Sequence, residues 1–196
     1  MIIRKTFTAE MGHLVRNCSS ARCKYSEHGH SAKIELFFQS MFLDNAQMVM
    51  DFGLMKGTIK EFIDSMDHCY LFCTKDDPEF ISFHKKYDER WIGIPFNPSA
   101  EMLSLFVYHY VNTIIQNTNY ANGELGIKLE AVRYHETASG YAECDYIDEE
   151  RLWSPFYSEN TIFSEGVTKD WSQPLYDCIF KNKPIQNEEV EQQIKL

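Results

Sequence analysis

The feature of this sequence that most constrains its fold is a pair of long stretches in which apolar and polar residues alternate. Residues 2–11 carry most of their apolar side chains on odd positions, and residues 28–43 begin with a set of even positions that runs to Phe38. Because successive side chains of a strand point to opposite faces of a sheet, both stretches are predicted to be strands with one buried face. The positions that define the two faces are Ile3, Phe7, Ala9 and Met11, followed by His13, and then His28, His30, Ala32, Ile34, Leu36 and Phe38.

The rest of the first 146 residues predicts two helices followed by two more strands. Residues 53–66 and the stretch that opens at Asn97-Pro98 have helical apolar spacing, with Asn97 expected as the N-cap. Residues 124–134 alternate with a phase shift, which predicts a bulge near Ala131, and Gly140 precedes a short fourth strand. This order predicts an α+β domain in which a four-stranded antiparallel sheet carries two helices between strands 2 and 3. Residues 74–97 are too long for a simple connection and are expected to hold a small extra element.

The chain is expected to divide into a domain over residues 1–146 and a C-terminal extension over residues 147–196. Aromatic residues indicate that much of the extension packs, whereas its last dozen residues are polar and acidic and are expected to be disordered. The aromatic residues concerned are Trp153, Phe156, Tyr157, Phe163, Trp171 and Phe180. The open edges of a four-stranded sheet are expected to pair with other subunits.

Charge and hydropathy exclude several classes of function. The net charge of −10 argues against a general nucleic-acid surface, although Arg16, Arg22 and Lys24 could hold a small anion. We expect no membrane association and a cytoplasmic location, since the sequence has neither a span of roughly 20 apolar residues nor a signal peptide. Its six cysteines are therefore expected to be reduced thiols.

The strongest chemical signal is His28-Gly29-His30, which places two imidazoles on one face of a strand. An H-x-H pair alone is often a solvent-exposed coincidence. His13, at the end of the neighbouring predicted strand, supplies a third ligand, and catalytic zinc sites use three protein ligands with an open fourth position. We therefore predict a zinc site made by His13, His28 and His30.

Other residues that could do chemistry carry weaker signals. Cys23 lies five residues before His28, where a nearby dication would favour its thiolate as a base or nucleophile, and Cys18 competes for that role. Asp67-His68 suits proton transfer but is equally typical of a helix C-terminus. Glu136 could accept two parallel hydrogen bonds or be an exposed charge at a strand end. Glu101 is interpreted as an acidic residue that stabilises the first turn of a helix.

The motifs, taken in order, resemble one family over about residues 3–146. They are Phe7-x-Ala9 with His13, Cys23 before His28-Gly29-His30, Asp51-Phe52, Asp67-His68, Asn97-Pro98-Ser99-Ala100-Glu101 and Glu136-Thr137. This set is similar to the 6-pyruvoyl tetrahydropterin synthase and 6-carboxy-tetrahydropterin synthase family. The resemblance implies the tunnelling fold, in which sheets of several subunits join into a barrel, commonly as a hexameric dimer of trimers.

The same resemblance implies roles for individual residues. His13, His28 and His30 would bind zinc, Cys23 would be the base, and Asp67 and His68 would relay the proton. Glu136 would anchor the pterin of 7,8-dihydroneopterin triphosphate, with Thr137, Ser99 and Ala100 as further substrate contacts. The spacing between Cys23 and His28 departs from that of other members, so Cys18 and Glu27 stay open as alternative bases.

The leading hypothesis for function is the carboxy-forming lyase of queuosine (7-deazapurine) synthesis. The spacing around His28 motivates this choice. The pyruvoyl-forming enzyme is the nearest alternative, and a non-catalytic zinc-binding or pterin-binding subunit is a third.

Overall fold

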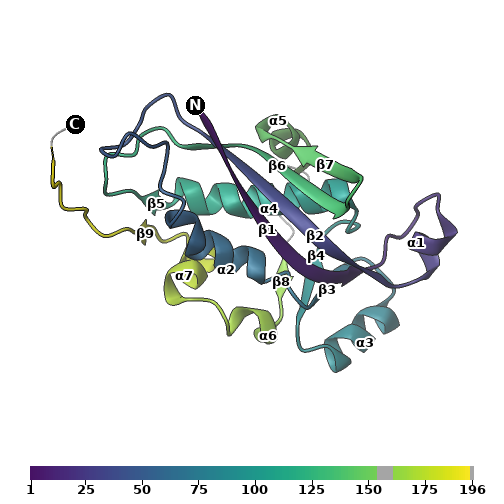
Figure 1. Ribbon diagram of the computed structural model, residues 1–196. Coiled ribbons are helices and arrows are strands. Elements are labelled where there is room, and N and C mark those ends of the chain that lie inside the picture. The colour runs from purple at the N-terminus through teal and green to yellow at the C-terminus, as the bar shows by residue number, and fades with distance from the viewer. Residues whose placement is uncertain (154–160, 195–196) are drawn as a thin grey trace.

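The structure is a computed structural model that describes residues 1–153 and 161–194. Figure 1 shows the arrangement of its helices and strands. In chain order they are β1 (Ile2–His13), α1 (Ala21–Tyr25), β2 (His28–Gln39), the 3₁₀ turn η1 (Leu54–Lys56), α2 (Thr58–Asp64), β3 (Cys69–Cys73), α3 (Pro78–Tyr87), β4 (Trp91–Ile94), α4 (Ala100–Gln116), β5 (Thr118–Asn119), β6 (Lys128–Thr137), β7 (Gly140–Cys144), α5 (Tyr146–Asp148), the π-helical turn η2 (Glu149–Trp153), β8 (Ile162–Phe163), α6 (Glu165–Thr168), α7 (Gln173–Lys181) and β9 (Ile185–Gln186).

The predicted antiparallel strands are present as β1, β2, β6 and β7, but the sheet continues beyond β1. Within the described residues its order is β7-β6-β2-β1-β3-β4-β8, with β3 parallel to β1 and β4 parallel to β3. The expected four-stranded, purely antiparallel sheet is corrected accordingly. The small extra element expected within residues 74–97 is present as α3 and β4, so three α-helices and not two lie between β2 and β6. Strand β3 is a short run without alternation, which periodicity cannot distinguish from other buried segments.

The register of β1 and β2 puts the three candidate ligands on one face. Met11 pairs with His30, and His13 pairs with His28. This face continues into the core, where Ala9, Ala32 and Ile34 are buried. In Figure 1, α2 and α4 lie behind β1 and β2, whereas the face toward the viewer carries no helix. The three histidines therefore lie at the end of the sheet, on the same face as the buried residues that pack against α2 and α4.

Helix α4 buries most of its predicted apolar stripe, including Leu103, Phe106 and Val107. Its N-cap is Ser99, whose hydroxyl accepts from the backbone N–H of Met102, and not Asn97 as predicted. The amide of Asn97 instead holds the backbone of Arg16. The local pattern predicted the start of the helix to within two residues. It did not predict that the Asn97 side chain bonds to Arg16, which is distant in sequence.

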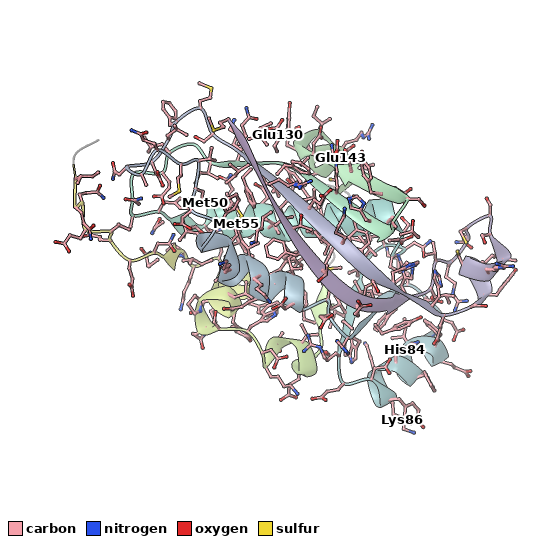
Figure 2. All side chains as sticks on the ribbon, in the orientation of Figure 1. Met50, Met55, His84, Lys86, Glu130 and Glu143 are labelled. Carbon is pink, nitrogen blue, oxygen red and sulfur yellow. The ribbon has the colours of Figure 1, made fainter. Side chains whose placement is uncertain are left out.

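Two other predicted elements are present with changed bounds. The helix expected over residues 53–66 is divided into η1 and α2 at Gly57, whose ψ of −124° is not helical. The predicted bulge in β6 is confirmed, because Phe37 pairs with Ala131 while Phe38 pairs with Leu129, which leaves Glu130 as the extra residue. Figure 2 labels Glu130, which is exposed, and the separate side chains of Met50 and Met55, which are buried in the core.

The C-terminal part of the chain packs against the same core. Strand β8 pairs with β4, and the indole N–H of Trp171 donates to Ser65 Oγ over 2.6 Å. Leu175 and Cys178 of α7 are buried, and Ile185 in β9 pairs with Thr118 of β5. The predicted packing of Phe156 and Tyr157 lies outside the described residues. Among the helices of residues 1–153 and 161–194, none is long and apolar enough to cross a membrane.

Candidate metal centre

Three imidazoles converge at the end of the β1–β2 ladder. The candidate ligand atoms of His13, His28 and His30 all lie within 4.8 Å of one another. The ring centroids are 4.6 Å apart for His13 and His28, 5.0 Å for His13 and His30, and 5.1 Å for His28 and His30. The sequence prediction that these three rings meet is confirmed.

Main-chain carbonyls orient two of the rings. His13 Nδ1 lies 2.7 Å from the carbonyl oxygen of Pro98, and His28 Nδ1 lies 3.0 Å from that of Ser26. Since a carbonyl oxygen only accepts, each Nδ1 must be the protonated donor, which leaves the Nε2 lone pair of a neutral ring available. Such outer hydrogen bonds are typical of metal-binding histidines.

The unpaired nitrogens fit a divalent metal. His13 Nε2 and His30 Nε2 are buried and have no hydrogen-bond partner in the described part of the chain. A buried polar atom without a partner costs about 1–3 kcal/mol, so two of them side by side indicate that a ligand completes the site. Three imidazoles with an open fourth position are the donor set of catalytic zinc.

Burial keeps His13 in the form that binds metals. Its side chain is fully buried, and desolvation lowers its pKa to about 4, assisted by repulsion from His28 and His30 and opposed by the bond to Pro98. The ring is therefore neutral near pH 7 and needs to lose no proton to coordinate a metal.

Glu136 faces this centre from β6. Its Oε1 lies 3.8 Å from His13 Nε2, and its Oε2 lies 4.0 Å from His30 Nε2. Burial raises its pKa, and nearby Glu101 adds to the shift while His30 and His28 oppose it. Oε1 is buried without a hydrogen-bond partner among the described residues. Glu136 is thus a partly buried carboxylate aimed at the candidate centre and not a fully exposed charge.

The other predicted contacts around Glu136 are less enclosed. Thr137 is exposed and its hydroxyl lies 3.5 Å from Ser139 Oγ. Ser99 and Ala100 are partly buried at the start of α4, where Ser99 is the N-cap. Glu101 lies in the first turn, as predicted, and its charge also reaches Glu136.

The three candidate bases lie in or beside the loop between β1 and β2. Cys23 is in α1 and is partly exposed, and its carbonyl accepts from the N–H of Val15 over 3.2 Å. The thiol of Cys18 donates to the carbonyl of Ser20 over 3.1 Å. Glu27 Oε1 lies 3.2 Å from His84 Nε2. The carboxylate of Glu27 is therefore engaged away from the histidines, whereas Cys23 Sγ has no hydrogen bond in the described structure.

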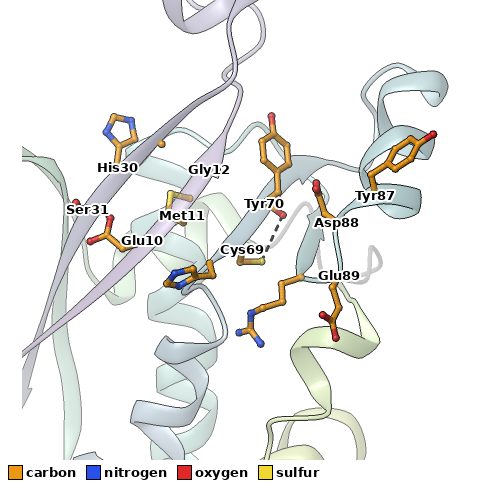
Figure 3. Close-up of a pocket in the computed structure, with 13 residues that line it drawn as sticks. Glu10, Met11, Gly12, His30, Ser31, Cys69, Tyr70, Tyr87, Asp88 and Glu89 are labelled. Atoms are coloured by element: carbon orange, nitrogen blue, oxygen red, sulfur yellow. Dashed lines mark hydrogen bonds between the residues drawn. The ribbon is translucent and has the colours of Figure 1, made fainter.

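Asp67 and His68 form the predicted pair, but they lie toward the opposite face of the sheet. Asp67 accepts from the backbone N–H of Glu10 over 2.7 Å and pairs with His68 Nδ1 over 2.9 Å. His68 is exposed and lines a groove of about 700 Å³ with Glu10 and Ser31, which point away from the core (Figure 3). Within the described residues of one chain, His68 has no hydrogen bond or ring contact with the three histidines.

Sequence reasoning missed the residues that support the centre from outside it. The carbonyl of Pro98 has no sequence signature, since any residue supplies one. The i, i+4 spacing of His84 and Asp88 could have predicted their pairing on a helix, but no sequence signal points to Glu27 as the third member. Arg16 is bonded to Asp76, so the expected basic patch is reduced to Arg22 and Lys24.

Fold and site together define an α+β protein with a three-histidine centre, beside a glutamate, at the end of its sheet. Residues 2–146 match the family described as 6-pyruvoyl tetrahydropterin synthase. A protein of Helicobacter pylori named 6-carboxy-5,6,7,8-tetrahydropterin synthase is 38% identical over 196 residues, covering 94% of this chain and 98% of that protein. A protein of the same name from Aquifex aeolicus is 32% identical and covers 72% of this chain and 95% of its own length. The chain belongs to the 6-pyruvoyl tetrahydropterin synthase family.

Solved structures share the fold. An uncharacterised protein from Wolinella succinogenes superposes with a TM-score of 0.60 at 22% identity, covering 74% of this chain and 98% of that one. The 6-pyruvoyl tetrahydropterin synthase of Caenorhabditis elegans superposes with a TM-score of 0.52 at 15% identity, covering 74% and 94%. The Helicobacter pylori relative extends beyond this shared region into the C-terminal part of the chain.

Proposed function

We propose that this chain is a zinc-dependent 6-carboxy-5,6,7,8-tetrahydropterin synthase of queuosine biosynthesis. It would convert 7,8-dihydroneopterin triphosphate and water to 6-carboxy-tetrahydropterin, acetaldehyde and triphosphate. The observation that carries the proposal is the convergence of His13, His28 and His30 beside the unpaired carboxylate of Glu136. The names of the relatives from Helicobacter pylori and Aquifex aeolicus favour the carboxy-forming reaction.

Glu136 is assigned to substrate orientation. Its two oxygens can accept parallel hydrogen bonds from the amino group and a ring N–H of the pterin, which fixes the side chain of the substrate relative to the histidines. Thr137, Ser99 and Ala100 are proposed to lie along the ring. Because Glu136 is partly buried, these hydrogen bonds would form away from bulk water, where they are stronger than at the surface.

The three histidines are assigned to zinc, and Cys23 to proton transfer. Zinc bound there would act as a Lewis acid on the side-chain oxygens of the substrate and acidify the neighbouring C–H and O–H groups. Cys23 Sγ would accept the proton as a thiolate. Cys23 is favoured over Glu27 because the carboxylate of Glu27 is paired with His84, and over Cys18 because that thiol is bonded to a carbonyl.

Asp67 and His68 are assigned to a proton relay that acts between subunits. His68 is exposed and has no hydrogen bond or ring contact with the three histidines among the described residues, although it lines the same groove as His30. In a homo-oligomer that joins sheets into a barrel, the partner subunit's His68 would approach Cys23. We propose such an assembly, with a hexamer as its expected size.

The reaction is tested by product identification. Purified protein incubated with 7,8-dihydroneopterin triphosphate is expected to give the mass of 6-carboxy-tetrahydropterin together with acetaldehyde. A product that retains the full side chain would identify the pyruvoyl-forming reaction, whose name the matched family carries. If no product forms although zinc binds, the chain would be a non-catalytic binding protein.

The metal and base assignments have separate tests. His30→Ala is expected to lose the zinc equivalent found by elemental analysis in the wild-type protein. Cys23→Ala is expected to retain zinc but lose at least about a hundredfold in kcat, the scale of general acid–base catalysis. Cys18→Ala is the matched control and should keep both zinc and turnover; unchanged turnover in Cys23→Ala would exclude Cys23 as the base.

A further inference from the structure

The loop over residues 14–27 connects two of the proposed ligands and carries Cys23. It leaves β1 directly after His13 and enters β2 directly at His28. Figure 1 shows that α1, within this loop, and α3 extend beyond the same end of the sheet. The position of this loop therefore affects both the metal centre and the candidate base.

The first end of the loop is fixed by Arg16. Its Nε donates to the two carboxylate oxygens of Asp76 over 3.1 and 2.9 Å, and its guanidinium lies 4.9 Å from the ring centroid of Phe80 in α3. The side-chain amide of Asn97 also accepts from the N–H of Arg16 and donates to its carbonyl. Both the side chain and the backbone of Arg16 are thus held.

The other end of the loop is fixed by Glu27, one residue before His28. Its Oε1 lies 3.2 Å from Nε2 of His84, a buried residue of α3 that Figure 2 labels. The second ring nitrogen of His84 lies 2.5 Å from Asp88 Oδ2. The two carboxylates thus flank the ring on both sides, so His84 can donate to either one.

Ring stacking connects His84 to the sheet. The His84 ring lies on Tyr70 of β3 with centroids 3.8 Å apart and an angle of 6° between the planes. Tyr70 in turn lies against Gly12, where an added Cβ would come within 3.1 Å of the tyrosine ring. Figure 3 shows Tyr70 and Asp88 close to each other along the groove. Contacts therefore run from α3 to the residue before His13 as well as to the residue before His28.

We propose that α3 is a brace for the metal-bearing loop and that His84 is its central positioning residue. The inference rests on the proposed zinc site, because its purpose is to hold His28 and Cys23 where that site needs them. His84 acts through Glu27 and touches neither metal nor substrate. Pre-positioning lowers the ordering cost of binding, so loss of the brace should weaken zinc affinity in the folded protein.

The test compares zinc affinity, by competition with a chelator, in wild type, Glu27→Ala, His84→Phe and the double variant. His84→Phe is expected to bind zinc roughly five- to tenfold more weakly, near the lower end of the effects of residues behind the ligands. Glu27→Ala also removes a negative charge near His28, so the single variants alone do not separate loss of the brace from loss of that charge. In the double variant the His84→Phe change should have little further effect, because the partner through which it acts is already gone.

Amide hydrogen exchange gives a second readout without metal or activity. In the metal-free protein, residues 26–30 should exchange faster in both single variants than in wild type. Wild-type zinc affinity in His84→Phe, or an undiminished His84→Phe effect in the Glu27→Ala background, would overturn the brace. If His84→Phe fails to fold, unchanged exchange in Glu27→Ala, whose side chain is half exposed, overturns it equally.

A matched control comes from a second stacked histidine. His109 of α4 lies 2.7 Å from Glu149 and stacks on Trp153 with centroids 4.0 Å apart. His109→Phe should lower stability while leaving zinc affinity and exchange at residues 26–30 unchanged. If the wild-type protein binds no zinc, the proposed metal site fails, whereas the exchange comparison still reports on the brace.

Discussion

Main-chain carbonyls orient two of the three histidines in the candidate metal centre. Pro98 and Ser26 each accept from the Nδ1 of a histidine, which directs the opposite nitrogen toward a shared point. His13 is the most constrained of the three rings, because it is fully buried as well as bonded. Its neutral form is therefore a property of the fold and is present before any metal binds.

The buried His13 should make the metal-free protein less stable in acid. Its pKa is about 4 in the folded protein and about 6.5 in the unfolded chain, so the unfolded state binds more protons between these values. Stability from this residue is complete above pH 6.5 and is lost as the pH falls toward 4, by up to about 3 kcal/mol.

Urea unfolding in the presence of a chelator checks this expectation. The free energy of unfolding of the wild-type protein should fall between pH 6.5 and 4, and the fall should be smaller in His13→Gln. Equal pH slopes in the two proteins would contradict a neutral, buried His13.

At the scale of elements, α4 connects the core to the site. Its N-terminus follows Pro98, which binds His13, and its first turn holds Glu101, whose charge acts on Glu136. The long apolar face of the helix fixes this end relative to the sheet. A substitution at the N-cap of α4 is therefore expected to lower the free energy of unfolding.

Ser99→Ala should cost about 1 kcal/mol of unfolding free energy, because it removes the N-cap acceptor of Met102 N–H. Ser99→Asn, which can also cap, should recover most of this loss. Denaturant midpoints of the three proteins provide the measurement. If Ser99→Ala keeps full stability but raises the KM for the pterin, then substrate contact and not capping is its main role.

At the scale of the whole molecule, the C-terminal residues complete the core of the family domain. Trp171 and Leu175 are buried, although the family match ends at residue 146. Strand β8 also covers the edge of β4. This arrangement leads us to expect one cooperative unit.

Leu175→Ala tests that expectation. Leu175 is fully buried, so the cavity should cost about 2–5 kcal/mol and lower a single unfolding transition for the whole protein. Circular dichroism and tryptophan fluorescence should shift together. Two separate transitions, only one of them displaced, would show that residues 147–196 unfold as an independent part.

The proposed assembly of the active site between subunits predicts complementation. Cys23→Ala and His68→Ala oligomers should each be inactive, but mixing them after dissociation should restore activity at about a quarter of the sites. This fraction arises because each site takes its cysteine from one subunit and its histidine from the neighbour. Light scattering should show the oligomer in both variants, and no recovery on mixing would place both groups in one subunit.

The sequence by itself determined strands β1, β2, β6 and β7, the apolar stripe of α4 and the identity of the three candidate ligands. Alternation depends only on local geometry, and antiparallel pairing of the two strands brings His13 opposite His28, although β2 ends at Gln39 and not at residue 43 as predicted. Local periodicity also gave the bulge in β6 and the apolar stripe of α4.

Only the tertiary structure decided which groups surround those ligands. The carbonyl of Pro98, the pairing of Glu27 with His84 and the placement of His68 near the other face all depend on residues that are distant in sequence. The sequence did not predict the parallel pairing of β3 and β4 for the same reason. The short buried run of β3 shows no alternation of apolar and polar residues, and the strands beside it come from other parts of the chain. Local pattern fixes which face a side chain points to, whereas long-range packing fixes what it meets there.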